Sequence, residues 1–138
     1  MNNKVQSILH NNPVGVIASI NGDGTPYTTP LHLVYDNETV YWLSSSQSQH
    51  SQNIDSQPSI SLSIWSPDET NGLAGLFIQS TVGVLDQNDR QYVLGKFVER
   101  FGAIPPALES ASAYSIRLGE IDTDKTSGDC VYLKQIKS

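Results

Sequence analysis

The sequence predicts a mainly β fold, a small antiparallel barrel of about six or seven short strands with two or three short helices. Apolar runs of strand length recur along the chain, and they are separated by turn-forming Asn, Asp, Gly and Pro residues. Helical spacing is confined to a few short segments. The 138 residues suffice for one domain and are too few for two, so we expect a single domain over residues 1–138.

The N-terminal part predicts a short helix followed by a hairpin. The helix ends before Pro13, and residues 14–20 form an apolar run of strand length. Asn21-Gly22-Asp23-Gly24 closes this run, a strong hairpin signal because Asn and Gly tolerate positive φ. The return strand over residues 26–35 contains two prolines, which cannot donate to a ladder, so we expect it to be an edge strand or interrupted.

The rest of the chain continues this rhythm. Residues 59–66 alternate apolar and serine positions, as in a half-buried strand. Residues 90–101 show helical periodicity, and Asp86–Asp89 offer caps for that helix. A loop is expected over residues 66–72, with bulges at Gly75 and Gly83. The other expected strands cover residues 39–44, 73–85, 114–118 and 131–136, and one further short helix covers residues 48–54.

The charge distribution restricts the classes of ligand. Eight Lys and Arg against fourteen Asp and Glu give a net charge of −6, which argues against a nucleic-acid surface. Between Lys4 and Arg90 there is no cationic side chain, whereas eight carboxylates fall in that stretch. An anion site there must use backbone N–H groups, hydroxyls, His, or cations from the last third of the chain or from a second subunit.

Several common sites are not expected. The single Cys130 is interpreted as a packed thiol, and His10, His32 and His50 are too scattered to predict a metal site. There is no phosphate-binding Walker loop and no Gly-x-Ser-x-Gly nucleophile elbow. Without an apolar signal segment or an apolar run of about 18 residues, we expect a soluble, cytoplasmic protein that contacts no membrane.

A polar segment over residues 44–54 is the main candidate for binding chemistry. It reads Ser-Ser-Ser-Gln-Ser-Gln-His-Ser-Gln-Asn-Ile and leads from a strand end through a turn into a short helix. Hydroxyls clustered beside the N–H groups of a helix start can form a phosphate cradle. The alternative is an ordinary solvated polar loop, and the residues alone leave both interpretations open.

The order of several segments resembles the pyridoxamine 5′-phosphate oxidase-like flavoproteins, the FMN-binding split barrels. The resemblance covers roughly residues 5–120 and implies a six-stranded antiparallel split β-barrel. It rests on Pro13-Val14-Gly15-Val16-Ile17-Ala18-Ser19, Gly24-Thr25-Pro26-Tyr27-Thr28-Thr29-Pro30-Leu31, Val40-Tyr41-Trp42-Leu43-Ser44, Ser48-Gln49-His50-Ser51-Gln52-Asn53-Ile54 and Pro58-Ser59-Ile60-Ser61-Leu62-Ser63-Ile64-Trp65.

This resemblance implies a homodimer with two FMN sites at the subunit interface. The phosphate would lie near Ser44, Ser48, Gln49 and His50, with Thr29 assisting. The flavin ring would lie along the strand formed by Thr28, Thr29, Pro30 and Leu31, with Leu43 nearby and Gln79 reaching the cofactor from the facing strand.

The chain departs from the family at its cationic positions. The family usually has Lys at the place of His50, often Arg or Lys at Gln49, and commonly Arg near Thr28 or Thr29. Charge-assisted hydrogen bonds contribute about 1.5–3 kcal/mol each, against about 0.5–1.5 kcal/mol for neutral ones. Replacing two charge-assisted hydrogen bonds by neutral ones would weaken phosphate binding by roughly 2–3 kcal/mol, about a hundredfold in affinity.

Two classes of function follow from the resemblance. The first is an FMN-dependent oxidoreductase acting on a small molecule, in which the cofactor supplies the hydride chemistry and no catalytic side chain is assigned. True pyridoxamine-phosphate oxidation is not expected, because the tail Val131–Ser138 lacks the parent enzyme's Arg-rich segment. The second is a non-catalytic binder of flavin or of another planar ligand, such as haem or a deazaflavin, although no His follows His50 as an axial haem ligand.

Overall fold

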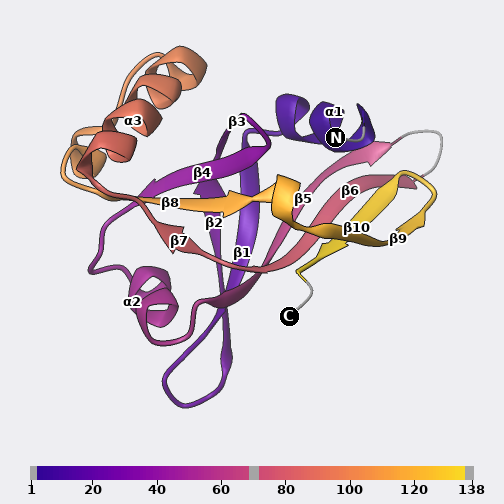
Figure 1. The fold of residues 1–138 in the computed structure, drawn as a ribbon, viewed down its shortest axis with the longest axis horizontal. Helices are drawn as coiled ribbons and strands as arrows, with labels where there is room; N and C mark the ends of the chain where they lie inside the picture. The colour runs from indigo at the N-terminus through magenta and orange to yellow at the C-terminus, as the bar shows by residue number, and fades with distance from the viewer. Residues whose placement is uncertain (1–2, 69–71, 136–138) are drawn as a thin grey trace.

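The computed structural model describes residues 3–68 and 72–135, which form two β-sheets with three α-helices around them (Figure 1). The helices are α1 (Asn3–Asn11), α2 (Gln49–Ser56) and α3 (Gln87–Phe101), and two short 3-10 helices are η1 (Pro106–Leu108) and η2 (Leu118–Glu120). The strands are β1 (Val14–Ile20), β2 (Pro26–His32), β3 (Val34–Asp36), β4 (Thr39–Ser44), β5 (Ser59–Asp68), β6 (Gly72–Thr81), β7 (Gly83–Val84), β8 (Ser112–Arg117), β9 (Asp122–Ser127) and β10 (Cys130–Lys134).

The strands divide into a six-stranded sheet in the order β2-β1-β5-β6-β10-β9 and a four-stranded sheet in the order β3-β4-β8-β7. The predicted mainly β, split-barrel fold class is confirmed, and the strand with two prolines, β2, lies at a sheet edge as expected. The strand pattern differs in detail from six antiparallel strands. Ten strands occur in the described residues, and β10 runs parallel to β6.

Two predicted strands are divided because the chain crosses between the sheets. The segment 26–35 breaks at Leu33, whose N–H donates to Pro13 O at 2.8 Å and whose side chain is buried. The segment 73–85 breaks at Val82, whose N–H donates to Pro58 O at 3.1 Å. Each break places one apolar residue between the sheets, which a strand pattern alone does not reveal.

Other differences are smaller. The predicted loop over 66–72 is shorter, since β5 extends to residue 68 and β6 starts at residue 72; residues 69–71 lie outside the described residues, as does residue 136 of the last predicted strand. Gly75 pairs regularly with Trp65, so the bulge expected there is absent. Strand β9 was not expected, because all six of its residues are exposed and it has no apolar alternation.

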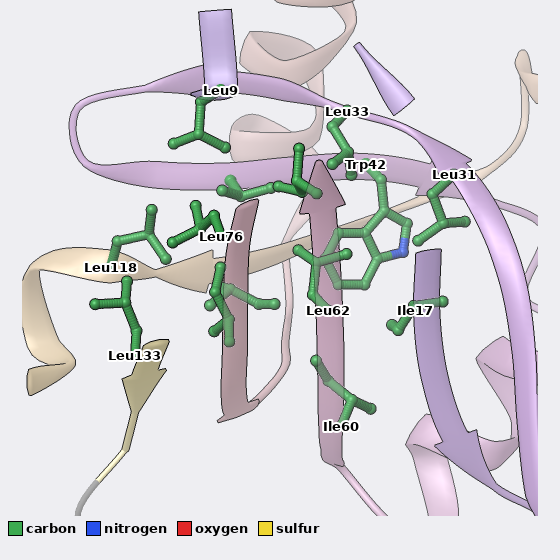
Figure 2. Close-up of a cluster of buried hydrophobic side chains, with 14 of the residues drawn as sticks. Leu9, Ile17, Leu31, Leu33, Trp42, Ile60, Leu62, Leu76, Leu118 and Leu133 are labelled. Atoms are coloured by element: carbon green, nitrogen blue, oxygen red, sulfur yellow. The ribbon is translucent and has the colours of Figure 1, made fainter. Parts of the chain in front are cut away.

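The main core lies between the sheets and contains side chains from both (Figure 2). Trp42 of β4 lies among Ile17, Leu31 and Leu62, which come from β1, β2 and β5, and it is fully buried. Helix α1 closes this core with an apolar face of Val5, Ile8 and Leu9. A second, smaller cluster joins Val93 and Phe97 of α3 to residues of the four-stranded sheet.

Candidate functional site

A polar cluster forms where β4 ends and α2 begins. Ser44 is the last residue of β4 and is only 5% exposed. His50, in the first turn of α2, places Nε2 2.8 Å from Ser44 Oγ and 3.4 Å from Ser48 Oγ. Three residues of the predicted phosphate cradle, which lie up to six positions apart in sequence, therefore meet at one imidazole nitrogen.

The start of α2 supplies backbone donors to the same place. Ser48 is the N-cap, and its Oγ accepts a bond from the Ser51 N–H at 3.4 Å and lies 2.8 Å from Ser51 Oγ. The N–H groups of Gln49 and His50 precede the first internal helical bond and have no acceptor within the helix. The first turn contains no acidic residue, so the partial positive charge of the helix start is not offset locally.

Asn53 holds this helix against the β1–β2 hairpin. Its side-chain amide donates to Ser19 Oγ and to Asn21 Oδ1, each at 3.0 Å, and its Oδ1 accepts from Gln49 Nε2 at 2.8 Å. Gln49 therefore faces the hairpin anchor rather than the hydroxyl cluster. The sequence gives Asn53 as part of the family pattern, but its role as the anchor becomes visible only when Ser19 and Asn21 are placed beside it.

The predicted ring-binding residues divide between two faces of β2. Thr28 and Pro30 are exposed, whereas Leu31 lies in the main core and Thr29 is half-buried opposite Ile17. Leu43 is also buried, in the cluster beneath α3. A ligand along β2 can thus meet the backbone of Leu31, but the buried side chains of Leu31 and Leu43 are not available to it.

Gln79 lies apart from the other predicted residues within one chain. It is exposed on β6, and the register runs from Thr28 through Ala18 and Ser61 to Gln79. Three strand spacings of about 4.8 Å put Thr28 and Gln79 roughly 14 Å apart, in one sheet rather than on facing strands. Gln79 lines a shallow groove of about 380 Å³ on the six-stranded sheet, together with Ser59, Ser61, Thr81 and Lys134.

The electrostatics of the cluster are governed by neutral groups. Burial lowers the pKa of His50 below its ordinary value of 6.5, which favours the neutral ring in the free protein. The guanidinium groups of Arg90 and Arg100 donate to backbone carbonyls elsewhere, and Arg117 pairs with Glu120. The cluster can therefore offer an anion hydroxyls, N–H groups and an imidazole, but no permanent cation from these three arginines.

In the described part of the chain, no group of three His, Cys, Asp or Glu side chains is arranged to hold a metal ion. The described helices include none that is long and apolar enough to cross a bilayer. Among residues 3–68 and 72–135, no carboxylate lies within hydrogen-bond distance of His50, so within these residues the Ser–His contact lacks the third group that would orient the imidazole as a base.

Comparisons with solved structures show the same fold. The haem-storage protein HutZ from Vibrio cholerae is 18% identical with a TM-score of 0.70, covering 83% of this chain and 87% of its own. An FAD-binding protein from Mesorhizobium loti is 21% identical with a TM-score of 0.63, covering 81% of this chain and 85% of its own. A candidate pyridoxamine 5′-phosphate oxidase from Listeria innocua is 21% identical with a TM-score of 0.64, covering 82% and 89%.

No curated protein sequence matches the chain. The family model described as pyridoxamine 5′-phosphate oxidase matches residues 1–126, nearly the whole sequence. The two-sheet architecture and this match agree with one another. The chain belongs to the pyridoxamine 5′-phosphate oxidase-like family.

Proposed function

We propose that this protein binds FMN and acts as a flavin-dependent oxidoreductase on a small molecule. The observation that carries the proposal is the convergence of Ser44, Ser48 and His50 at the N-terminus of α2, in a chain of this family. Hydroxyls and free N–H groups at a helix start suit a phosphate. The solved relatives include an FAD-binding protein, which supports a flavin as the ligand class.

The chain's own contribution is binding and orientation. In this proposal Ser44, Ser48 and His50 donate to the phosphate, with Gln49 and Thr29 assisting, and the backbone of Thr28–Leu31 lines the ring. Bound FMN would supply two-electron transfer. The described residues near the cluster include no carboxylate in contact with His50, so we assign no side chain as catalytic acid or base.

We also propose a homodimer formed through the outer face of the six-stranded sheet. Alternate positions of β1, β5 and β6 point away from the core, and four exposed large apolar residues lie there. They are Val14, Ile20, Trp65 and Leu73. Large apolar side chains gathered on one face are typical of an interface. Gln79 shares this face, so a ligand at the interface would meet it from the second subunit.

Haem is the second candidate ligand. It is favoured by the similarity to HutZ, a haem-storage protein, over most of both chains. His50 is the histidine of the cluster, and to become an axial haem ligand through Nε2 it would have to give up its contacts with two hydroxyls. A deazaflavin would use the same donors as FMN, and a non-catalytic flavin binder would differ from the enzyme only in lacking turnover.

The test is a titration of the purified apoprotein with FMN, followed by flavin fluorescence, and a parallel titration with haem, followed in the Soret region. We expect saturable FMN binding, weakened about tenfold or more by Ser44→Ala because a buried donor is lost. Ser46→Ala, in the same loop but exposed, is the matched control and should leave the affinity unchanged. Haem binding without FMN binding would replace the flavin proposal with the haem one.

A further inference from the structure

The cluster at the start of α2 has one titratable group in contact with its hydroxyls. His50 Nε2 lies 2.8 Å from Ser44 Oγ and 3.4 Å from Ser48 Oγ, and the side chain is half-buried. A neutral imidazole carries one N–H, whereas its protonated form carries two and a full positive charge. The protonation state of this ring therefore sets how many N–H donors and how much positive charge the cluster can offer to an anion.

Among the described residues, the elements packed around α2 place no cation within hydrogen-bond distance of His50. Helix α2 itself carries only Asp55 as a charged group, and β1 carries no titratable side chain. Strand β2 carries Tyr27 and His32, and the turn before it carries Asp23, whose pKa is held low by hydrogen bonds from Thr25.

At the end of β4, Ser44 pairs with Ser112 of β8. The segment that precedes Ser112 carries Glu109, and Arg90 donates to the carbonyls of Ala111 and Glu109. None of the groups on these elements forms a hydrogen bond or an ion pair with His50 in the described part of the chain. A phosphate in the cluster would consequently be the dominant charge acting on the imidazole.

We propose that His50 is the specificity-determining residue of this site, because binding of a phosphomonoester end is coupled to uptake of one proton by its ring. This rests on the proposed function. Burial disfavours the charged ring in the free protein, whereas a phosphate within hydrogen-bond distance favours it. Between the pKa of the free form and that of the complex, affinity falls toward tenfold for each unit of rising pH. A permanent cation at position 50 would give no such dependence.

The consequence is selectivity among related ligands. Riboflavin lacks the phosphate, so it cannot draw a proton onto His50, and its affinity should be indifferent to the ring's charge. FMN should be preferred over riboflavin on the acidic side, and this preference should shrink as pH rises. The second ionisation of the phosphate, near pH 6, also affects binding. In free FMN it is common to every variant, so a difference between variants reports on the complex.

The experiment measures the dissociation constants of FMN and riboflavin from pH 5.5 to 8.5 for the wild type, His50→Gln and His50→Lys, by flavin fluorescence. Calorimetry in buffers of different ionisation enthalpy gives the number of protons taken up. We expect net uptake with FMN by the wild type, a smaller uptake by both variants, and none with riboflavin. The preference for FMN over riboflavin should fall with pH in the wild type and stay higher in His50→Lys above pH 7.

The outcomes separate the two proposals. If FMN binds and both variants take up as many protons as the wild type, the role of His50 is wrong and the proposed function stands. If FMN and riboflavin bind equally in all three proteins, the phosphate is not held at this cluster and the inference is again overturned. If neither flavin binds at any pH, the proposed function falls and the inference falls with it. Folding of each variant is checked by circular dichroism.

Discussion

The side-chain amide of Asn53 donates to Ser19 Oγ at 3.0 Å and thereby ties α2 to β1 across 34 residues of sequence. The same nitrogen donates to Asn21 Oδ1 at 3.0 Å, so the helix is held at both the strand and the turn that follows it. Because α2 has only two turns and few buried apolar side chains, these bonds define where its first turn lies. The position of His50 beside Ser44 depends on them.

Asn53→Ala should therefore destabilise the protein. The substitution removes the side-chain amide that donates a hydrogen bond to Ser19 Oγ, and Ser19 is fully buried. We expect a loss of about 1–3 kcal/mol in the free energy of unfolding. Urea denaturation measures it. Gln52→Ala is the control, because Gln52 is exposed and its side chain donates to the carbonyl of the exposed Gln47; it should change stability by less than about 0.5 kcal/mol. Equal midpoints for both variants would contradict the anchoring role.

The β1–β2 hairpin offers a second test, with a matched pair of glycines. Gly24 has φ +87° and Gly22 does not have positive φ, while a Cβ at either would meet no atom within 4 Å. Gly24→Ala should cost about 1–2 kcal/mol, since a left-handed conformation is unfavourable for Ala. Gly22→Ala should be neutral or slightly stabilising, because it restricts only the unfolded chain. Thermal unfolding of the two variants, compared with the wild type, would show whether the difference between them has this sign.

Most of the fold could be predicted because its signals are local. The Asn-Gly-Asp-Gly turn and the caps expected in Asp86–Asp89, among which Asp86 is the N-cap of α3, each act within a few residues of their own position. The alternation of β5 is likewise confirmed, with Ile60, Leu62 and Ile64 buried. Such features depend on the periodicity of a segment and on hydrogen bonds between residues close in sequence, so a short stretch of sequence is enough to predict them.

The remaining features depend on contacts between distant residues. Leu33 ends β2 because its N–H finds Pro13 O, and β9 exists because β10 offers it a partner, not because its own residues alternate. For the site, the polar segment could be identified but not its internal order: the sequence does not indicate that His50 turns to Ser44 or that Gln49 turns to Asn53. The separation of Gln79 from Thr28 could not be predicted either, because it depends on the order of the strands in the sheet.

The ligand-free protein should lose stability as pH falls below 7, in part through His50. Burial holds the pKa of His50 below its ordinary value of 6.5 in the folded state. Between the two pKa values the unfolded chain binds more protons, so the free energy of unfolding decreases as pH falls through 6.5 and levels off below the folded pKa. In His50→Gln this contribution is absent. Urea denaturation from pH 7.5 to 5 should show the wild type losing stability relative to the variant, and a constant difference would contradict it.

The outer face of the six-stranded sheet gives the last prediction, which concerns assembly. Trp65 is 46% exposed on this face, and Val98 is 47% exposed on α3, so the two positions present large apolar groups to a similar degree in one chain. If the sheet face forms the dimer, Trp65→Ser removes an aromatic anchor from both subunits at once. Aromatic residues at interface centres commonly contribute at least 2 kcal/mol, so the dimer dissociation constant should rise by about a hundredfold or more. Light scattering at micromolar concentration should then report the 15.1 kDa chain for Trp65→Ser, and twice that mass for the wild type and for Val98→Ser. A monomeric wild type would refute the dimer. If Val98→Ser is monomeric and Trp65→Ser remains a dimer, the interface lies on α3 and not on the sheet face.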